Sequence, residues 1–210
     1  MQCPKLPWRM NTISIPVWER FLQATPELAF VELDLAAQGD PILAIESVAA
    51  STREVVFSVR SSAEEVLWLP KALGRAAEAL EHAISLARKT GFLPAICPSA
   101  IGFPSDIPST LSFLRAHQSE KLGLVIEPAA LMTEPLVKFA REHFGRMTDA
   151  LFPCQHLKGV VLSNIRWTQG KPIRTGLADG AIPPLELERI AASIPESAWV
   201  IQTSSLAAQS

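Results

Sequence analysis

The chain has 210 residues, 48% of them hydrophobic and 19% charged, so it can bury one full-size core and its composition argues against disorder. The formal net charge is −2 and tyrosine is absent, so neither a basic footprint nor an aromatic-rich surface predicts a nucleic-acid or membrane partner. The three cysteines, Cys3, Cys97 and Cys154, are far apart in sequence. We also find no signal-peptide pattern and no apolar run of about 18 residues. Together with the scattered cysteines, these features favour a cytoplasmic chain without disulfides.

The first third of the chain alternates short apolar runs with helical patterns. Over 29–35, Phe30, Glu32 and Asp34 fall on one face and Val31, Leu33 and Leu35 on the other, and residues 54–60 are β-branched and aromatic; both patterns are typical of strands. In chain order we expect a strand over 12–16, a helix over 17–23, a strand over 29–35, a helix over 42–50 and a strand over 54–60.

The clearest helix is predicted over 70–90. Pro70 suits its first turn, Arg88 and Lys89 suit its last turn, and Gly91 suits the position after its end. The same cues predict the elements that follow. These are a strand over 92–97, a helix over 108–117, a strand over 122–127, a helix over 134–144 between Thr133 and Gly145, a short strand over 150–153, a strand over 158–165, a loop over 170–180, a helix over 184–193 and a strand over 199–203.

About eight strands separated mostly by helices predict a parallel sheet with helices outside it. We therefore expect an α/β fold, a TIM-type (β/α) barrel of about eight parallel strands, in one domain over 1–210, with its last helix short or missing. An open nucleotide-binding sheet would need a glycine-rich turn after the first strand, and residues 15–18 read Ile-Pro-Val-Trp instead.

In such barrels the chemistry lies at the carboxyl ends of the strands and in the loops that follow them. Polar residues at those predicted positions are the candidate site residues. They are Glu32, Asp34, Ser58, Arg60, Ser99, Glu127, His156, Ser163, Asn164, Arg166, Gln202, Thr203 and Ser204.

The strongest signal is the pair Glu32 and Asp34, two carboxylates on one face of an otherwise apolar strand. Burying them needs a cation or hydrogen-bond donors, so they indicate a metal, a positive ligand or acid–base catalysis. The alternative is an ion pair with Arg60 on the next strand. Glu127, just before Pro128, has the same two interpretations: a ligand or base, or the partner of a nearby cation.

The loop over 170–180 could bind phosphate through backbone N–H groups, with Lys171 and Arg174 adding positive charge. The alternative is an ordinary loop that needs its glycines for their backbone freedom. Cys154, His156 and Cys97 are too few and too irregularly spaced to predict a zinc site, and Cys97 fits an inert buried thiol better.

Four segments carry a family resemblance: Phe30-Val31-Glu32-Leu33-Asp34, Val56-Phe57-Ser58-Val59-Arg60, the passage from Gly91 to Ser99 with Phe103, and Leu111 to Leu114 followed by Leu124 to Pro128. They resemble the YecE-like family, a barrel family of unknown function. The match covers roughly 28–130, and the resemblance would carry over Glu32, Arg60, Pro98 and Glu127.

Several polar positions of that family are replaced here, which implies a degenerate, partly eroded site. Ala36-Ala37 stands for an aromatic pair and Ala129 for an arginine. A second resemblance, to the sugar phosphate isomerase/epimerase barrels, implies a divalent metal held by carboxylates and a histidine. Glu127 and 176–182 fit that pattern, but the expected histidine on the strand near Asn164 is missing and Gln202 replaces a glutamate.

Three function classes remain. The first is a YecE-like barrel, without a cofactor, that binds a small anionic or phosphorylated ligand. Its site would use Glu32, Asp34, Arg60 and Glu127 as the candidate catalytic groups, and Ser99, Asn164, Arg166, Lys171, Arg174 and Gln202 as ligand contacts. The second is a sugar phosphate isomerase or epimerase that depends on a divalent metal. The third is a non-catalytic barrel that binds a protein partner or a second copy of itself.

Overall fold

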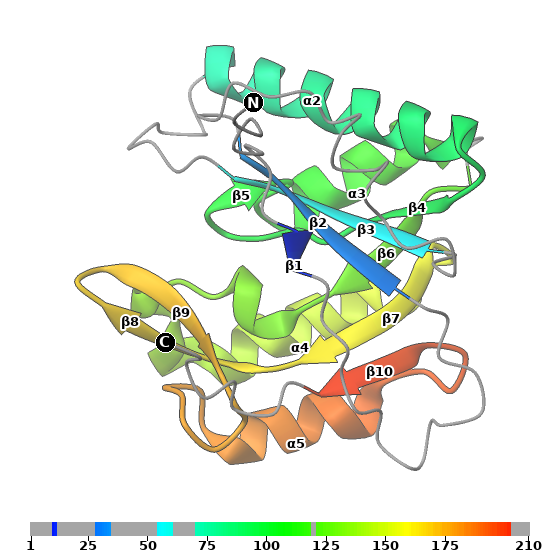
Figure 1. Cartoon of the computed structure of the whole chain (residues 1–210). Helices are drawn as coiled ribbons and strands as arrows, with labels where there is room; N and C mark the ends of the chain where they lie inside the picture. The colour runs from blue at the N-terminus through cyan, green and yellow to red at the C-terminus, as the bar shows by residue number, and fades with distance from the viewer. Residues whose placement is uncertain (1–9, 12–27, 35–53, 61–69, 119–120, 203–210) are drawn as a thin grey trace, which may run out of the picture.

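The computed structural model describes residues 10–11, 28–34, 54–60, 70–118 and 121–202 (Figure 1). Its main sheet follows the order β1-β2-β3-β4-β6-β7-β10, with β5 paired to β3. The strands are β1 (Met10–Asn11), β2 (Leu28–Asp34), β3 (Glu54–Arg60), β4 (Leu93–Ile96), β5 (Gly102–Phe103), β6 (Gly123–Ile126), β7 (Leu157–Leu162) and β10 (Trp199–Gln202).

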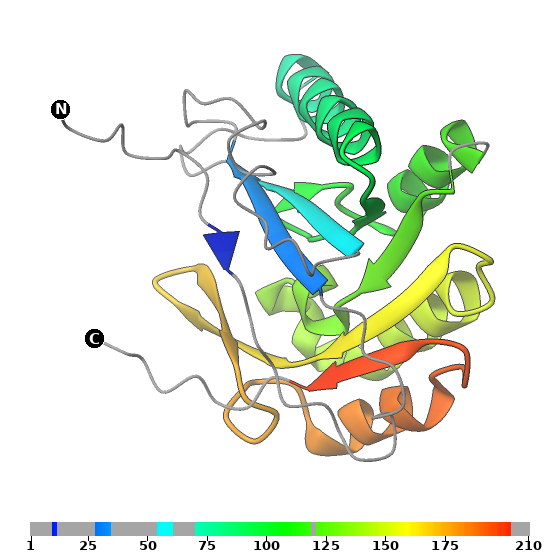
Figure 2. The same ribbon diagram turned by 45° about the vertical axis from the view of Figure 1, so that its right-hand side comes forward.

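The sheet curls into a half-barrel whose convex side carries the helices (Figures 1 and 2). Within the described residues, β2, β3, β4, β6, β7 and β10 pair in parallel, while β1 and β5 pair antiparallel. The helices are α2 (Pro70–Lys89), α3 (Ile107–Ala116), α4 (Ala140–Leu151) and α5 (Pro184–Ser193), with 3-10 turns η3 (Pro128–Leu131) and η4 (Glu134–Phe139). A mixed α/β fold built on parallel strands is therefore confirmed, and a full barrel of eight parallel strands is not.

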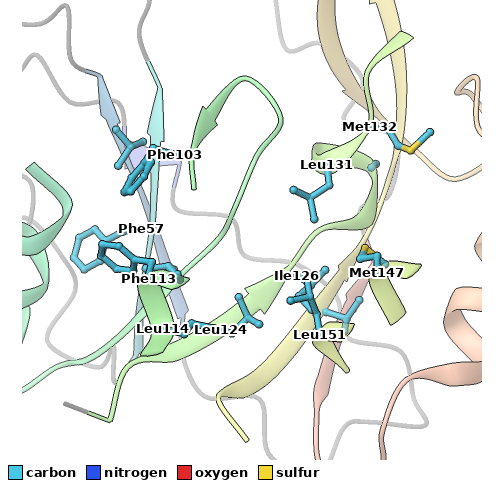
Figure 3. Packing of buried hydrophobic residues seen from close by; sticks show 14 of the residues in the cluster. Phe57, Phe103, Phe113, Leu114, Leu124, Ile126, Leu131, Met132, Met147 and Leu151 are labelled. Atoms are coloured by element: carbon cyan, nitrogen blue, oxygen red, sulfur yellow. The ribbon is translucent and has the colours of Figure 1, made fainter. Parts of the chain in front are cut away.

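Hydrophobic side chains fill both faces of the sheet. The larger cluster lies between the sheet and the helices, where Phe57 and Leu124 of the sheet pack with Phe113 of α3 and Met147 of α4 (Figure 3). The smaller cluster lies on the concave face. Each parallel strand supplies one or two of its side chains, and Cys97 adds one just after β4; the members are Phe30, Val56, Ala95, Cys97, Val125, Val161, Trp199 and Ile201. Because successive strand residues point to opposite faces, these residues fix which positions of each strand face the concave side.

Several predicted elements are confirmed. The strand over 54–60 and the helix over 184–193 have the predicted bounds, and α2 ends at Lys89, one residue before the predicted end. Gly91 has the left-handed backbone, φ +88°, expected after a helix end. The predicted elements over 12–16, 17–23 and 42–50 lie outside the described residues.

Two regions differ from the prediction. The strand expected over 150–153 is wrong because α4 continues to Leu151, and Gly145 lies inside that helix. The buried stripe of Ala140, Phe144, Met147 and Leu151 holds the helix together across the glycine.

The loop expected over 170–180 instead contains a strand. A two-stranded hairpin is formed by β8 (Asn164–Thr168) and β9 (Lys171–Thr175), which pair only with each other among the described strands. Gln169 and Gly170 form its turn, both with positive φ (52° and 74°), as a tight two-residue hairpin requires. The predicted strand over 158–165 is thereby divided at Ser163, where β7 gives way to β8.

Candidate functional site at the carboxyl edge of the half-barrel

Polar side chains follow the concave apolar cluster at the carboxyl edge of the sheet. Glu127 comes two residues after Val125, and Ser163 two residues after Val161, so both continue the concave face of their strands. Ser58 of β3 is half-buried in the equivalent place, two residues after Val56. This edge is where barrel-type sheets place their functional groups.

Glu127 is the centre of this edge, and its side chain is only 3% exposed. Ser163 Oγ donates a hydrogen bond to its Oε1 over 2.6 Å. Arg174 Nε donates to the same oxygen over 2.6 Å, and Arg174 Nη2 donates to Oε2. The carboxylate is therefore paired with a guanidinium and satisfied on both oxygens, as a buried charge must be. We call Glu127, Ser163 and Arg174 the rim cluster.

Arg174 reaches the rim cluster from the inner face of the β8–β9 hairpin. The register pairs it with the buried Ile165, and pairs Pro172 with Trp167, both half-buried. Its guanidinium contacts the buried carboxylate, while the Arg174 side chain as a whole remains 41% exposed. A hairpin strand absent from the prediction thus supplies the charge that Glu127 needs.

Lys171 and Arg166 belong to the outer face of the hairpin. Lys171 pairs with Thr168 and Arg166 pairs with Ile173, and all four are exposed. The prediction that Lys171 and Arg174 hold one anion together is not met, because their side chains leave the strand on opposite faces.

Cys97 lies beside the rim cluster at the end of β4. Its backbone N–H donates to Phe57 O over 2.8 Å, and its side chain is 6% exposed. Burial, followed by the negative charge of Glu127, raises the pKa of the thiol to about 12, against the opposing effects of Arg174 and a Glu127 backbone hydrogen bond. The neutral thiol is a poor nucleophile and a poor metal ligand, in line with the inert buried cysteine expected.

Asn164, expected to bind a ligand, shapes the chain after the hairpin instead. Its Nδ2 donates to Leu177 O (2.9 Å) and Ile182 O (3.0 Å), and its Oδ1 accepts from the N–H groups of Ile165 (2.8 Å) and Ile182 (3.0 Å). These four bonds use the donors and lone pairs of the amide, and the side chain is 1% exposed. Gly180 is required there because a Cβ would overlap the Asn164 side chain.

Two other predicted site residues lie away from the concave rim. Gln202 directly follows Ile201 of the concave cluster, so its position lies on the opposite face of β10. It pairs with Leu162, which belongs to the helix-facing core. His156 precedes β7, and its Nδ1 bonds to Leu122 O over 2.8 Å, just before β6. His156 is therefore at the amino edge of the sheet, and the prediction that placed it at the carboxyl edge is wrong.

Ser99 lies at the carboxyl edge but in the turn that leads to β5. Its N–H donates to Pro104 O over 3.0 Å and its carbonyl accepts from Gly102 N–H over 2.8 Å. Glu32, Asp34 and Arg60 are placed by backbone register alone: Glu32 pairs with Ser58 and Asp34 with Arg60. Thr203 and Ser204 lie outside the described residues.

Sequence reasoning places Ser163 among the strand-end residues but assigns it no specific role. The signal for it was strand alternation, since it shares the face of Val161. Within the described ranges, no group of three or more His, Cys, Asp or Glu is arranged to hold a metal ion. None of the described helices has the length and apolar character needed to cross a membrane.

Comparison with known proteins leaves the family open. No protein-family model matches the chain, and no curated protein matches it. Among solved structures, the chain is similar to the crystal structure of a xylose isomerase domain protein from Planctomyces limnophilus, at 10% identity and a TM-score of 0.45. The match covers 72% of this chain and 52% of that one, so the chain spans about half the length of that structure. The YecE-like resemblance is not confirmed.

Proposed function

We propose that the chain binds a small anionic ligand, carrying a phosphate or carboxylate group, at the carboxyl edge of the half-barrel, with Arg174 as its cationic contact. One observation carries the proposal: the Arg174 guanidinium is fixed by the buried Glu127, while the Arg174 side chain as a whole is 41% exposed. An arginine held in one orientation loses less freedom when it binds an oxyanion, which favours recognition.

The surroundings suit a ligand with an anionic end and hydroxyl groups. The buried concave cluster lies beneath the rim, and the half-buried Ser58 places a hydroxyl group at the rim itself. Binding sites commonly combine apolar surroundings with a few fixed polar groups. In this proposal Glu127 positions Arg174 and does not itself contact the ligand.

The contacts of Glu127 favour anion binding over the metal-dependent isomerase. Both carboxylate oxygens already accept hydrogen bonds from Ser163 and Arg174. A divalent ion bound to Glu127 would have to displace the guanidinium or share an oxygen with it, at an electrostatic cost. Arg174, by contrast, can meet an oxyanion from the solvent side without leaving Glu127.

The test is a thermal-shift titration in phosphate-free, low-salt buffer with inorganic phosphate, a hexose phosphate and the matching uncharged hexose. Ligands that bind the native state raise the midpoint, and we expect the rise with the two phosphates. The double variant Glu127→Gln/Arg174→Gln, which removes both charges of the pair together, should lose the rise. Lys171→Gln removes the same charge from the outer face of the same hairpin and should keep it.

Three results would overturn the proposal. They are no rise with either phosphate in the wild type, an equal rise in the double variant, or a loss of the rise in Lys171→Gln alone. A rise only with divalent metals would support the isomerase hypothesis instead. Co-purification of another chain together with no response to any ligand would support the partner-protein hypothesis.

A further inference from the structure

A cavity lies on the helix side of the loops that follow β4 and β6. Its volume is about 570 Å³, within the range of small-molecule sites. Its walls come from the start of α3, the turns η3 and η4, and one face of α4. None of its lining residues belongs to the rim cluster or to the concave cluster.

The lining is mainly apolar with a few polar groups at its margin. The apolar part consists of Ala100, Ile107, Pro108, Leu131, Leu136 and Ala150. The loop from β4 is tied to η3 by the bond from Ala100 N–H to Ala130 O, 2.8 Å, which connects two of the walls. Such a lining suits the body of an apolar ligand.

The charges around the cavity favour an acidic group on that ligand. Arg146 of α4 lines it, and no carboxylate lies within ion-pair distance of Arg146 in the described part of the chain. Arg146 Nε donates a long hydrogen bond, 3.4 Å, to Glu142 O of its own helix. Asp106 also lines the cavity, but its Oδ1 accepts the Ser109 N–H over 2.8 Å as the cap of α3.

His143, one turn before Arg146, contributes no competing positive charge. Burial, followed by the nearby charge of Arg146, holds the pKa of His143 below its usual range, against a smaller effect of the Leu131 backbone. The imidazole is therefore neutral at neutral pH, and Arg146 is the cation of the cavity among the described lining residues.

We infer that this cavity binds a small amphipathic carboxylate, with its apolar body against Leu131 and Leu136 and its carboxylate on Arg146. The planar guanidinium matches a carboxylate in geometry as well as in charge. This site is independent of the proposed anion site at the carboxyl edge, since the two share no residue.

The test compares octanoate with octanamide, which has nearly the same shape without the charge, by calorimetric titration of the whole chain. We expect octanoate to bind wild type about tenfold more tightly than octanamide, the difference that one charge-assisted hydrogen bond supplies. Arg146→Gln should abolish that difference. Arg141→Gln removes an exposed arginine of the same helix that does not line the cavity, and should preserve it.

A filling variant locates the site. Ala150→Phe places a ring into the cavity from α4 and should weaken binding of both octanoate and octanamide, with far-UV circular dichroism to confirm that α4 still folds. The inference is overturned if octanoate does not bind, if Arg146→Gln binds it as tightly as Arg141→Gln, or if folded Ala150→Phe binds both compounds unchanged. Loss of phosphate binding at the carboxyl edge would leave this result untouched.

Discussion

The two ends of the concave face each carry a glutamate, and the two carboxylates differ in the hydrogen bonds and charges that surround them. At the carboxyl edge, Glu127 is 3% exposed and accepts hydrogen bonds from Ser163 and Arg174 on both oxygens. At the amino edge, Glu54 begins β3, half-buried and near Trp199 of β10.

Burial dominates the behaviour of Glu54. Desolvation raises the pKa of its carboxyl group above the usual value, and the Trp199 indole and the charge of Lys158 oppose this only in part. Because β3 and β10 are not neighbours in the sheet, Trp199 reaches across the concave face to approach Glu54. The amino edge is thus closed by an aromatic ring, whereas the carboxyl edge is built from charged and hydroxyl groups.

This difference separates the two ends of the half-barrel, and the charged end is the one where we propose that the ligand binds. Parallel strands direct their following loops to the carboxyl edge, where a hairpin can bring in a new charge such as Arg174. At the amino edge, the Trp199 indole and the charge of Lys158 compensate the Glu54 carboxylate only in part. We therefore expect substitutions at the two edges to differ in size and in sign.

The largest expected change in the free energy of unfolding follows from removing the charge that pairs with Glu127. Arg174→Gln should lower the free energy of unfolding by about 3 kcal/mol, since it leaves a buried carboxylate without its partner. We expect a value at the low end of the range for a broken buried ion pair, because the Arg174 side chain is 41% exposed. Urea denaturation measures it, and adding Glu127→Gln should recover most of the loss. A single variant as stable as wild type would show that solvent satisfies Glu127.

A medium effect is expected at the amino edge, where Trp199 packs directly over Gly159. A Cβ at Gly159 would overlap the Trp199 ring, so Gly159→Ala should destabilise the fold by about 1–3 kcal/mol. Gly145→Ala is the matched control, because a Cβ there meets nothing within 4 Å. Inside α4 it should stabilise by about 0.5–1 kcal/mol. If both variants lost stability equally in thermal unfolding, close packing at Trp199 would not be the cause.

Sequence periodicity predicted the elements that bury one strong stripe or face. The strand over 54–60 and the helix over 184–193 were predicted with the observed bounds. The hairpin strand β9 was missed because Lys171–Thr175 contains Pro172 and buries no residue fully. The local signal of Gly145 predicts a helix end, because such a signal cannot report the tertiary packing of Met147 and Leu151 beyond it.

The site was predicted in part. Glu127 was identified from its place between a strand and a proline, and the interpretation as the partner of a nearby cation is confirmed. Its partner Arg174 was named but assigned to a shared anion with Lys171, because the strand that separates their faces was not predicted. A contact between residues 47 positions apart depends on the fold and not on a local pattern. The interpretations of Glu32, Asp34 and Arg60 remain predictions.

The smallest expected effect has the opposite sign and tests the amino edge directly. The pKa of Glu54 is raised in the folded chain, so its protonated form stabilises the fold below the unfolded pKa, about 4.3, and this contribution is lost as pH rises through the folded value. The substituted side chain of Glu54→Gln stays neutral, so at pH 7 the free energy of unfolding of this variant should exceed that of wild type. The difference should be less than about 1 kcal/mol because the group is only partly buried. Near pH 3 the two should coincide, and the exposed Glu78→Gln should match wild type at both pH values. If Glu54→Gln is less stable at pH 7, the attraction to Lys158 outweighs desolvation, and both edges of the half-barrel would then stabilise their carboxylates by pairing.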